Sequence, residues 1–158
     1  MADILNVGDT APDFTLTNQD GRKISLEQFK GKWVVLYFYP RALTPGCTAQ
    51  AKSLRDHMAD IKKLGAVVLG VSPDKTESLK KFEKRDELNF PLLGDPEHTM
   101  AEDYGAWQEK SMYGRLFMGF QRMTYIIDPE GKIAHVIPKA KPKTHTEDVI
   151  NFLKDKVN

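Results

Sequence analysis

The stretch Trp33-Val-Val-Leu-Tyr-Phe-Tyr39, followed at once by Pro40-Arg-Ala-Leu-Thr44-Pro45-Gly46-Cys47, decides the fold of this chain. Seven consecutive apolar or aromatic residues are typical of a strand that is buried on both faces of a sheet. After the turn, apolar side chains recur at steps of three and four residues, at Ala51, Leu54, Met58, Ile61 and Leu64. This spacing predicts an amphipathic helix. The order is therefore strand, tight turn and helix, with the only cysteine of the chain where the helix starts.

The position of Cys47 predicts a nucleophilic thiol. At a helix N-terminus, unpaired N–H groups and the positive end of the helix dipole stabilise an anion, and the pKa of a thiol falls from about 8.5 to between roughly 3.5 and 7.5. Thr44 is close enough on a tight turn for its hydroxyl to donate to the thiolate or to a bound oxygen. The ring of Pro40, which ends the strand, would shield the sulfur from water.

Each of these residues also has a purely structural interpretation. A lone cysteine often serves as a small buried apolar residue. Thr44 would then act only as a helix cap, and Pro40 only as a strand stop. The placement of Cys47 directly after Thr44-Pro45-Gly46 favours catalysis.

The rest of the chain alternates strands with helices, and no linker or repeat interrupts it. The predicted elements are a hairpin over 14–26 around Asp20-Gly21, a strand over 66–71, a helix from a capping box at Asp74 and Glu77 to about Leu88, a strand over 91–93, a short helix over 95–104, a hairpin of strands 122–128 and 132–137, and a final helix after a capping box at Thr144 and Glu147. Helical crossovers imply parallel strands and hairpins imply antiparallel ones. We therefore expect one α/β domain over residues 1–158, in which a central mixed sheet with an N-terminal β-hairpin is flanked by helices.

Composition excludes several classes of function. A net charge of +1 over 158 residues gives no reason to expect nucleic acid or an anionic membrane as a partner. The N-terminus lacks a basic segment followed by an apolar one, and no apolar run approaches the roughly 20 residues that cross a bilayer. A single cysteine argues against a secreted disulfide scaffold, so the cytoplasm is the expected compartment. The four histidines lack the close spacing of metal ligands.

The segment Phe38-Tyr39-Pro40-(x)3-Thr44-Pro45-Gly46-Cys47-Thr48 resembles the active-site signature of the peroxiredoxins. More narrowly, it is similar to the bacterioferritin-comigratory-protein or PrxQ subfamily of thiol peroxidases, whose fold is thioredoxin-like. The likeness covers nearly the whole chain, through Gly8-Asp9-x-Ala11-Pro12-Asp13-Phe14, Val68-Leu69-Gly70-Val71-Ser72-x-Asp74, Phe90-Pro91-Leu92-Leu93-x-Asp95 and Arg122-(x)5-Asp128-(x)2-Gly131.

The resemblance implies a role for each motif residue. Cys47 becomes the peroxidatic nucleophile, Thr44 the hydroxyl that holds thiolate and peroxide together, and Pro40 the shield. Arg122 becomes the guanidinium that lowers the pKa of the thiol and polarises the peroxide. The implied reaction is attack of the thiolate on an O–O bond of hydrogen peroxide or an organic hydroperoxide, which leaves a sulfenic acid on Cys47. No metal, flavin or haem is required.

One departure from the subfamily changes the expected cycle. Many members carry a second, resolving cysteine five residues after the first, where this chain has Lys52. With one cysteine an intramolecular disulfide is impossible, so an external thiol must reduce the sulfenic acid. Thioredoxin, glutaredoxin and a small thiol remain open. So does the oligomeric state: the subfamily suggests a monomer, and a homodimer joined through two Cys47 sulfurs is the alternative.

Other interpretations also stay open. A thiol-disulfide oxidoreductase normally needs a Cys-x-x-Cys pair, which is absent. In a noncatalytic redox sensor or chaperone-like binder, oxidised Cys47 would signal without turning over. Physics alone does not single out Arg122 over Arg115. The aromatic residues of the segment 105–120 either pack on the sheet, which is favoured, or shape the peroxide entrance. The three lysines between Lys139 and Lys143 form either a solvated face, which is favoured, or a contact for an acidic partner.

Overall fold

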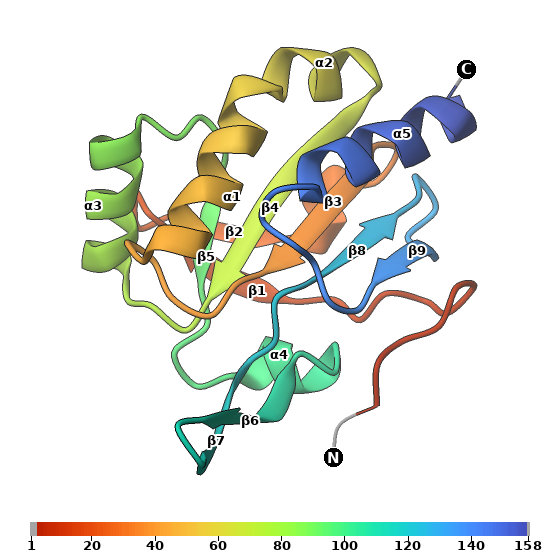
Figure 1. Ribbon diagram of the computed structural model, residues 1–158. Coiled ribbons are helices and arrows are strands. Elements are labelled where there is room, and N and C mark those ends of the chain that lie inside the picture. Colours follow the sequence, from red (N-terminus) through yellow and green to blue (C-terminus); the bar gives the residue numbers. More distant parts are fainter. Residues whose placement is uncertain (1–2, 158) are drawn as a thin grey trace.

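A computed structural model describes residues 3–157 of the chain (Figure 1). The strands are β1 (Thr15–Asn18), β2 (Lys23–Ser25), β3 (Trp33–Phe38), β4 (Ala66–Ser72), β5 (Leu92–Gly94), β6 (Trp107–Met112), β7 (Arg115–Phe120), β8 (Met123–Ile127) and β9 (Ile133–Ile137). The helices are the 3-10 helix η1 (Leu26–Phe29), α1 (Pro45–Asp56), α2 (Met58–Lys63), α3 (Thr76–Asp86), α4 (Thr99–Asp103) and α5 (His145–Val157).

The main sheet has seven strands in the order β2-β1-β5-β4-β3-β8-β9. Strand β4 pairs in parallel with both β3 and β5, whereas β8 pairs antiparallel with β3 and with β9. Strands β1 and β2 form the predicted antiparallel hairpin at one edge. The prediction of a central mixed sheet with an N-terminal β-hairpin is therefore confirmed.

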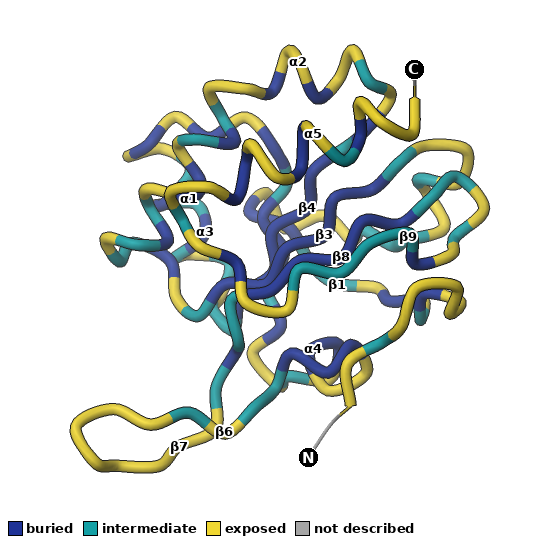
Figure 2. The backbone as a smooth tube through the Cα atoms, turned by 45° about the vertical axis from the view of Figure 1, so that its right-hand side comes forward, coloured by how far each residue is buried: buried dark blue, intermediate teal, exposed yellow. Residues whose placement is uncertain are grey.

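Strand β3 is an interior strand of this sheet, between β4 and β8, and its side chains belong to two separate hydrophobic clusters. Val35 and Tyr37 face the cluster made with α1, α2, α3 and α5, while Val34 and Leu36 face the cluster made with α4 and the N-terminal segment. Full burial of one such side chain stabilises the fold by roughly 1.5–3 kcal/mol. Figure 2 shows the central strands as the buried layer between the helices. Burial on both faces explains the uninterrupted apolar run of this strand.

The helix after Cys47 is shorter than its apolar spacing predicted. It ends at Asp56, and α2 begins again at Met58. At the junction, the His57 ring nitrogen Nδ1 lies 2.8 Å from the Ser53 carbonyl, the acceptor that the His57 N–H would use in a continuous helix. That N–H instead reaches the Leu54 carbonyl. Competition for one acceptor thus interrupts the helix.

Residues 107–120 form a hairpin that the sequence did not predict. Strands β6 and β7 pair only with each other, and the hairpin projects from the body of the molecule (Figures 1 and 2). Phe120 is buried and Trp107 half-buried where the hairpin joins the body, but Tyr113 is 99% exposed and Phe117 is 41% exposed. The favoured prediction that these aromatic residues pack on the sheet therefore holds for the base of the hairpin only.

Candidate active site

Cys47 lies in the first turn of α1, which follows the C-terminal end of β3. Leu43 adopts a left-handed backbone with φ of 68°, which a residue with a Cβ rarely takes. Thr44 then occupies the N-cap position and Pro45 the first helical position, so Cys47 is the third residue of the helix. Proline suits that first position because its missing N–H would have no partner there. The prediction of Cys47 at a helix N-terminus is confirmed.

The thiol is enclosed, with only 1% of Cys47 exposed. It belongs to the hydrophobic cluster on the α1 side of the sheet, beside Tyr37 and Tyr39. Burial raises the pKa of Tyr37 well above its ordinary value, and Tyr39 and Cys47 add to that rise. Tyr37 and Tyr39 therefore stay neutral and present rings and hydroxyl groups, not negative charge, next to the thiol.

Arg122 reaches the first turn of α1 from the residue just before β8. Its Nη1 donates to Oε1 of Gln50 at 2.7 Å. Its Nη2 lies so near Gly46 that a Cβ on this glycine would sit 3.2 Å from it. Gly46 adjoins Cys47, and Gln50 lies one helical turn beyond it, so the guanidinium is held along the turn that carries the thiol. Arg115 instead lies exposed at the far end of the hairpin β6–β7.

Gln50 is a site residue that the sequence did not single out. Its side chain is fully buried, and among the residues that the structure describes its Nε2 has no hydrogen-bond partner. The available signal was its spacing: residues three apart on a helix share a face, so Gln50 had to lie beside Cys47. A buried, uncharged amide at that place aligns Arg122 without neutralising it.

Thr44 and Pro40 stand in the loop before the helix, and both are partly buried. The Thr44 hydroxyl donates to the Arg41 carbonyl at 2.8 Å, and the side chain makes no capping hydrogen bond to the helix. Its proton is thus engaged in the loop, and its oxygen keeps its lone pairs free as acceptors. We expected this hydroxyl to donate to the thiolate or to a bound oxygen; in this structure it donates within the loop, not to the thiolate.

Asp74 fixes the same loop from the end of β4. Its Oδ2 accepts hydrogen bonds from the Ala42 N–H at 2.7 Å and from the Ser72 hydroxyl at 2.8 Å. The prediction that Asp74 opens a capping box was wrong, because α3 begins at Thr76 with Lys75 at its N-cap position. The carboxylate binds the loop that precedes the thiol instead.

Two further cationic or titratable side chains lie near Arg122. His145, the first residue of α5, is fully buried, and its Nε2 lies 2.7 Å from the Thr124 hydroxyl. Burial, with a contribution from Arg122, lowers the pKa of His145 to about 4, so the ring is neutral at pH 7. Lys110 extends from β6 and donates from Nζ to the Phe120 carbonyl at 3.0 Å. Burial lowers the pKa of Lys110, as does Arg122, whereas Cys47 opposes that change.

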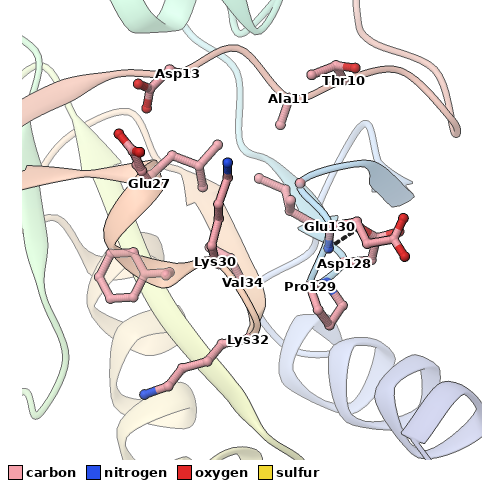
Figure 3. Close-up of a pocket in the computed structure, with 14 residues that line it drawn as sticks. Thr10, Ala11, Asp13, Glu27, Lys30, Lys32, Val34, Asp128, Pro129 and Glu130 are labelled. Atoms are coloured by element: carbon pink, nitrogen blue, oxygen red, sulfur yellow. Dashed lines mark hydrogen bonds between the residues drawn. The ribbon is translucent and has the colours of Figure 1, made fainter.

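A cavity of about 350 Å³ opens at the opposite end of the sheet (Figure 3). Val34 near the start of β3 and Ile127 at the end of β8 line it, so it is remote from the thiol. Across residues 3–157, no three His, Cys, Asp or Glu side chains are grouped to hold a metal ion. Within the same range, no helix combines the length and the apolar character that spanning a membrane requires.

The sequence is similar to known proteins over most of its length. A sequence model described as "AhpC/TSA family" matches residues 7–136. The chain belongs to the AhpC/TSA family. Peroxiredoxin Bcp of Escherichia coli (strain K12) is 47% identical over 151 residues, which cover 96% of this chain and 97% of that protein. Peroxiredoxin Bcp of Bacillus subtilis (strain 168) is 41% identical and covers 96% of each chain.

Solved structures agree with this family assignment. A structure of PrxQ from Xylella fastidiosa, a cysteine-to-serine mutant, superposes with a TM-score of 0.93 at 29% identity and covers 99% of both chains. The bacterioferritin comigratory protein of Xanthomonas campestris superposes with a TM-score of 0.89 at 30% identity over 100% of both chains. The chain is thus a peroxiredoxin of the Bcp and PrxQ type with a thioredoxin-like fold, and the sequence-based family and fold assignments are confirmed.

Proposed function

We propose that this chain is a thiol-dependent peroxidase that reduces hydrogen peroxide and organic hydroperoxides through Cys47. The observation that carries the proposal is the pairing of a buried thiol at the third position of α1 with the Arg122 guanidinium held against the same turn. The helix N-terminus and the guanidinium both stabilise a thiolate and the negative charge that develops on a peroxide oxygen.

The proposed reaction follows from these positions. The Cys47 thiolate attacks one oxygen of the peroxide in line with the O–O bond. A S–O bond forms, the O–O bond breaks, and the second oxygen leaves with a proton as water or an alcohol. The sulfur is oxidised to a sulfenic acid and the peroxide is reduced by two electrons. Arg122 donates to the peroxide oxygens as their charge grows.

Thr44 and Pro40 complete the proposed site. Because the Thr44 proton is donated to the Arg41 carbonyl, its oxygen is free to accept a hydrogen bond from the O–H of the peroxide. That bond would orient the peroxide between the thiolate and the guanidinium. The Pro40 ring, which carries no N–H, would limit the access of water to the sulfur.

An external thiol closes the proposed cycle because the chain has one cysteine. One thiolate attacks the Cys47 sulfur, an S–S bond forms, and the hydroxyl leaves with a proton as water. A second thiolate then attacks the reductant sulfur of this mixed disulfide and releases the Cys47 thiolate. Thioredoxin, glutaredoxin and small thiols all supply the required chemistry. The Xanthomonas campestris protein is described as having alkyl peroxide reduction activity, which supports organic hydroperoxides as substrates here.

The organisation of the molecule is part of the same proposal. Strands from both ends of the chain, β1 and β9, belong to one sheet, which supports a single domain. We expect that domain to act as a cytoplasmic monomer, and light scattering of the reduced protein measures its mass directly.

Turnover tests the peroxidase against a sensor. With excess dithiothreitol and hydrogen peroxide, the wild type is expected to consume many equivalents of peroxide per chain. Cys47→Ser should lose this activity and keep its fold, as judged by circular dichroism. Consumption that stops after about one equivalent, or that persists in Cys47→Ser, would contradict the proposal, and the first result would favour the sensor.

A further inference from the structure

The loop 138–144, which joins β9 to α5, brings a row of lysines to the start of the thiol helix. Lys139, Lys141 and Lys143 are exposed, and they alternate with residues that are buried or half-buried. The buried Ala140 donates its N–H to the Arg122 carbonyl at 2.8 Å. The loop is therefore attached to the backbone of Arg122, whose guanidinium lies along the first turn of α1.

Two more contacts set the path of this loop, one to α1 and one to β8. The Pro142 Cγ lies 3.9 Å from the place where a Cβ on Gly46 would be, directly before Cys47. Immediately after the loop, His145 lies 2.7 Å from the Thr124 hydroxyl in the interior. With Ala140, Pro142 and His145 fixed, the exposed Lys139, Lys141 and Lys143 lie on a loop that passes the start of α1.

Other cationic side chains lie near the start of α1. Arg41 is exposed in the loop before α1, and Lys110 lies beside Arg122. Acidic groups on the neighbouring elements are Asp74, which already accepts two hydrogen bonds, and Glu147 and Asp148 in the first turn of α5. Among residues 3–157, the ammonium groups of the three lysines make no ion pair. Their positive charge is therefore available to a ligand.

We propose that Lys139, Lys141 and Lys143 form a cationic rim that selects small thiols carrying a carboxylate as the reductants of oxidised Cys47. The inference rests on the proposed peroxidase function and names the reductant class for it. A slender thiol suits a sulfur whose residue is only 1% exposed, and a cationic opening raises the local concentration of anions. The carboxylate stays on the rim while the thiolate enters and forms the S–S bond with Cys47, releasing water.

The test compares three proteins. The rim variant is Lys139→Gln, Lys141→Gln and Lys143→Gln combined. The matched control combines Lys62→Gln, Lys63→Gln and Lys154→Gln, which removes the same charge from exposed sites on α2 and α5. Each protein is first oxidised with one equivalent of hydrogen peroxide, and intact mass confirms the added oxygen. Its reduction by mercaptopropionate, mercaptoethanol and mercaptoethylamine is then followed by stopped flow.

The informative quantity is the rate constant for reduction by mercaptopropionate divided by that for reduction by mercaptoethanol. When this ratio is compared between two proteins, the intrinsic reactivities of the two thiols cancel. In the rim variant this ratio should fall about 3- to 10-fold, from three unit charges near the opening at moderate ionic strength. The rate with the cationic mercaptoethylamine should rise, and the control variant should behave like the wild type.

Three outcomes would overturn the inference. If the ratio is equal in wild type and rim variant, the lysines do not select the thiol. If the control variant loses as much as the rim variant, only net charge matters. If the wild type gains no oxygen from peroxide, the peroxidase function itself fails and the inference fails with it. If Cys47 is oxidised normally but the ratio of rate constants is unchanged, the proposed role of the lysines is wrong and the proposed peroxidase function stands.

Discussion

After Cys47, Arg122 is the residue on which the chemistry of the site depends most. Arg122→Gln removes the charge and the two-nitrogen fork that lies along Gly46 and Gln50. We expect the rate constant for Cys47 oxidation to fall by about 10²- to 10³-fold, the usual effect of removing one preorganised donor. Arg115→Gln, on the exposed end of the hairpin, is the control and should stay within about twofold of wild type. Equal losses in both variants would contradict the assignment.

Two substitutions of Thr44 separate its structural role from its chemical role. Thr44→Val keeps the shape of the side chain and removes the oxygen, whereas Thr44→Ser keeps the oxygen. The valine variant should oxidise about 10²-fold more slowly with hydrogen peroxide, while the serine variant should retain most of the rate. Stopped-flow fluorescence or competition with a known peroxidase measures both. A valine variant as fast as wild type would leave Thr44 with a loop contact only.

At the residue scale the sequence was informative where a local pattern sets the position. The turn after Tyr39 and the proline at the first helical position placed Cys47 correctly. The engaged proton of Thr44 was not predictable, because it depends on the carbonyl of Arg41 turning toward it. The role of Gln50 needs Arg122 to arrive from a distant strand, and no local rule supplies that contact.

The Asp74 carboxylate binds the loop between β3 and α1 to the end of β4. Asp74→Ala removes the acceptor for the Ala42 N–H and for the Ser72 hydroxyl, which is fully buried. We expect a loss of about 1–3 kcal/mol in the free energy of unfolding, since groups inside the protein lose a charged partner. Urea denaturation measures it, with the exposed Asp60→Ala as control. A variant as stable as this control would show that the loop does not need Asp74.

His145, the first residue of α5, is expected to make the free energy of unfolding depend on pH. The pKa of His145 is about 4 in the folded protein, below the ordinary value of 6.5. The unfolded chain therefore binds this proton between those values and the folded one does not, so stability falls as the pH drops from about 6.5 to 4. From pH 7 to 4.5 this amounts to about 2 kcal/mol for this group alone.

The variant His145→Gln isolates that contribution. Urea denaturation at both pH values should show a smaller loss of unfolding free energy on acidification in the variant than in the wild type. His135, whose pKa is also lowered by burial, is present in both proteins and cancels in the comparison. An identical loss in both proteins would show that His145 does not become charged on unfolding in this range.

At the element scale, periodicity predicted most strands and helices, and side-chain chemistry explains the misses. The helix after Cys47 breaks because the His57 ring competes for a carbonyl. The predicted capping box at Asp74 does not form, because this carboxylate accepts a hydrogen bond from the Ala42 N–H in the loop before α1. The hairpin β6–β7 was not predicted, because its exposed apolar residues, among them Tyr113 and Leu116, do not follow the alternation of apolar and polar residues that marks a half-buried strand.

The whole molecule places its chemistry by topology. The parallel strands β3 and β4 both finish at the end of the sheet where α1 begins. The residues after β4 bring Asp74 to the loop between β3 and α1, which Cys47 follows. Arg122 arrives there because β8 runs antiparallel to β3, so that the start of β8 meets the end of β3. The mixed sheet was predictable from the order of elements, but the order of strands, and with it this meeting of loops, was not.

The assembled site is proposed to make Cys47 a peroxidatic thiol. The most direct test is the rate at which pre-reduced protein consumes one equivalent of hydrogen peroxide, followed by intact mass without reductant. We predict a rate far above that of a free thiol, lost in Cys47→Ser, with a mass gain of one oxygen on the wild type. Oxidation no faster than that of the same cysteine in the urea-unfolded chain would contradict the account.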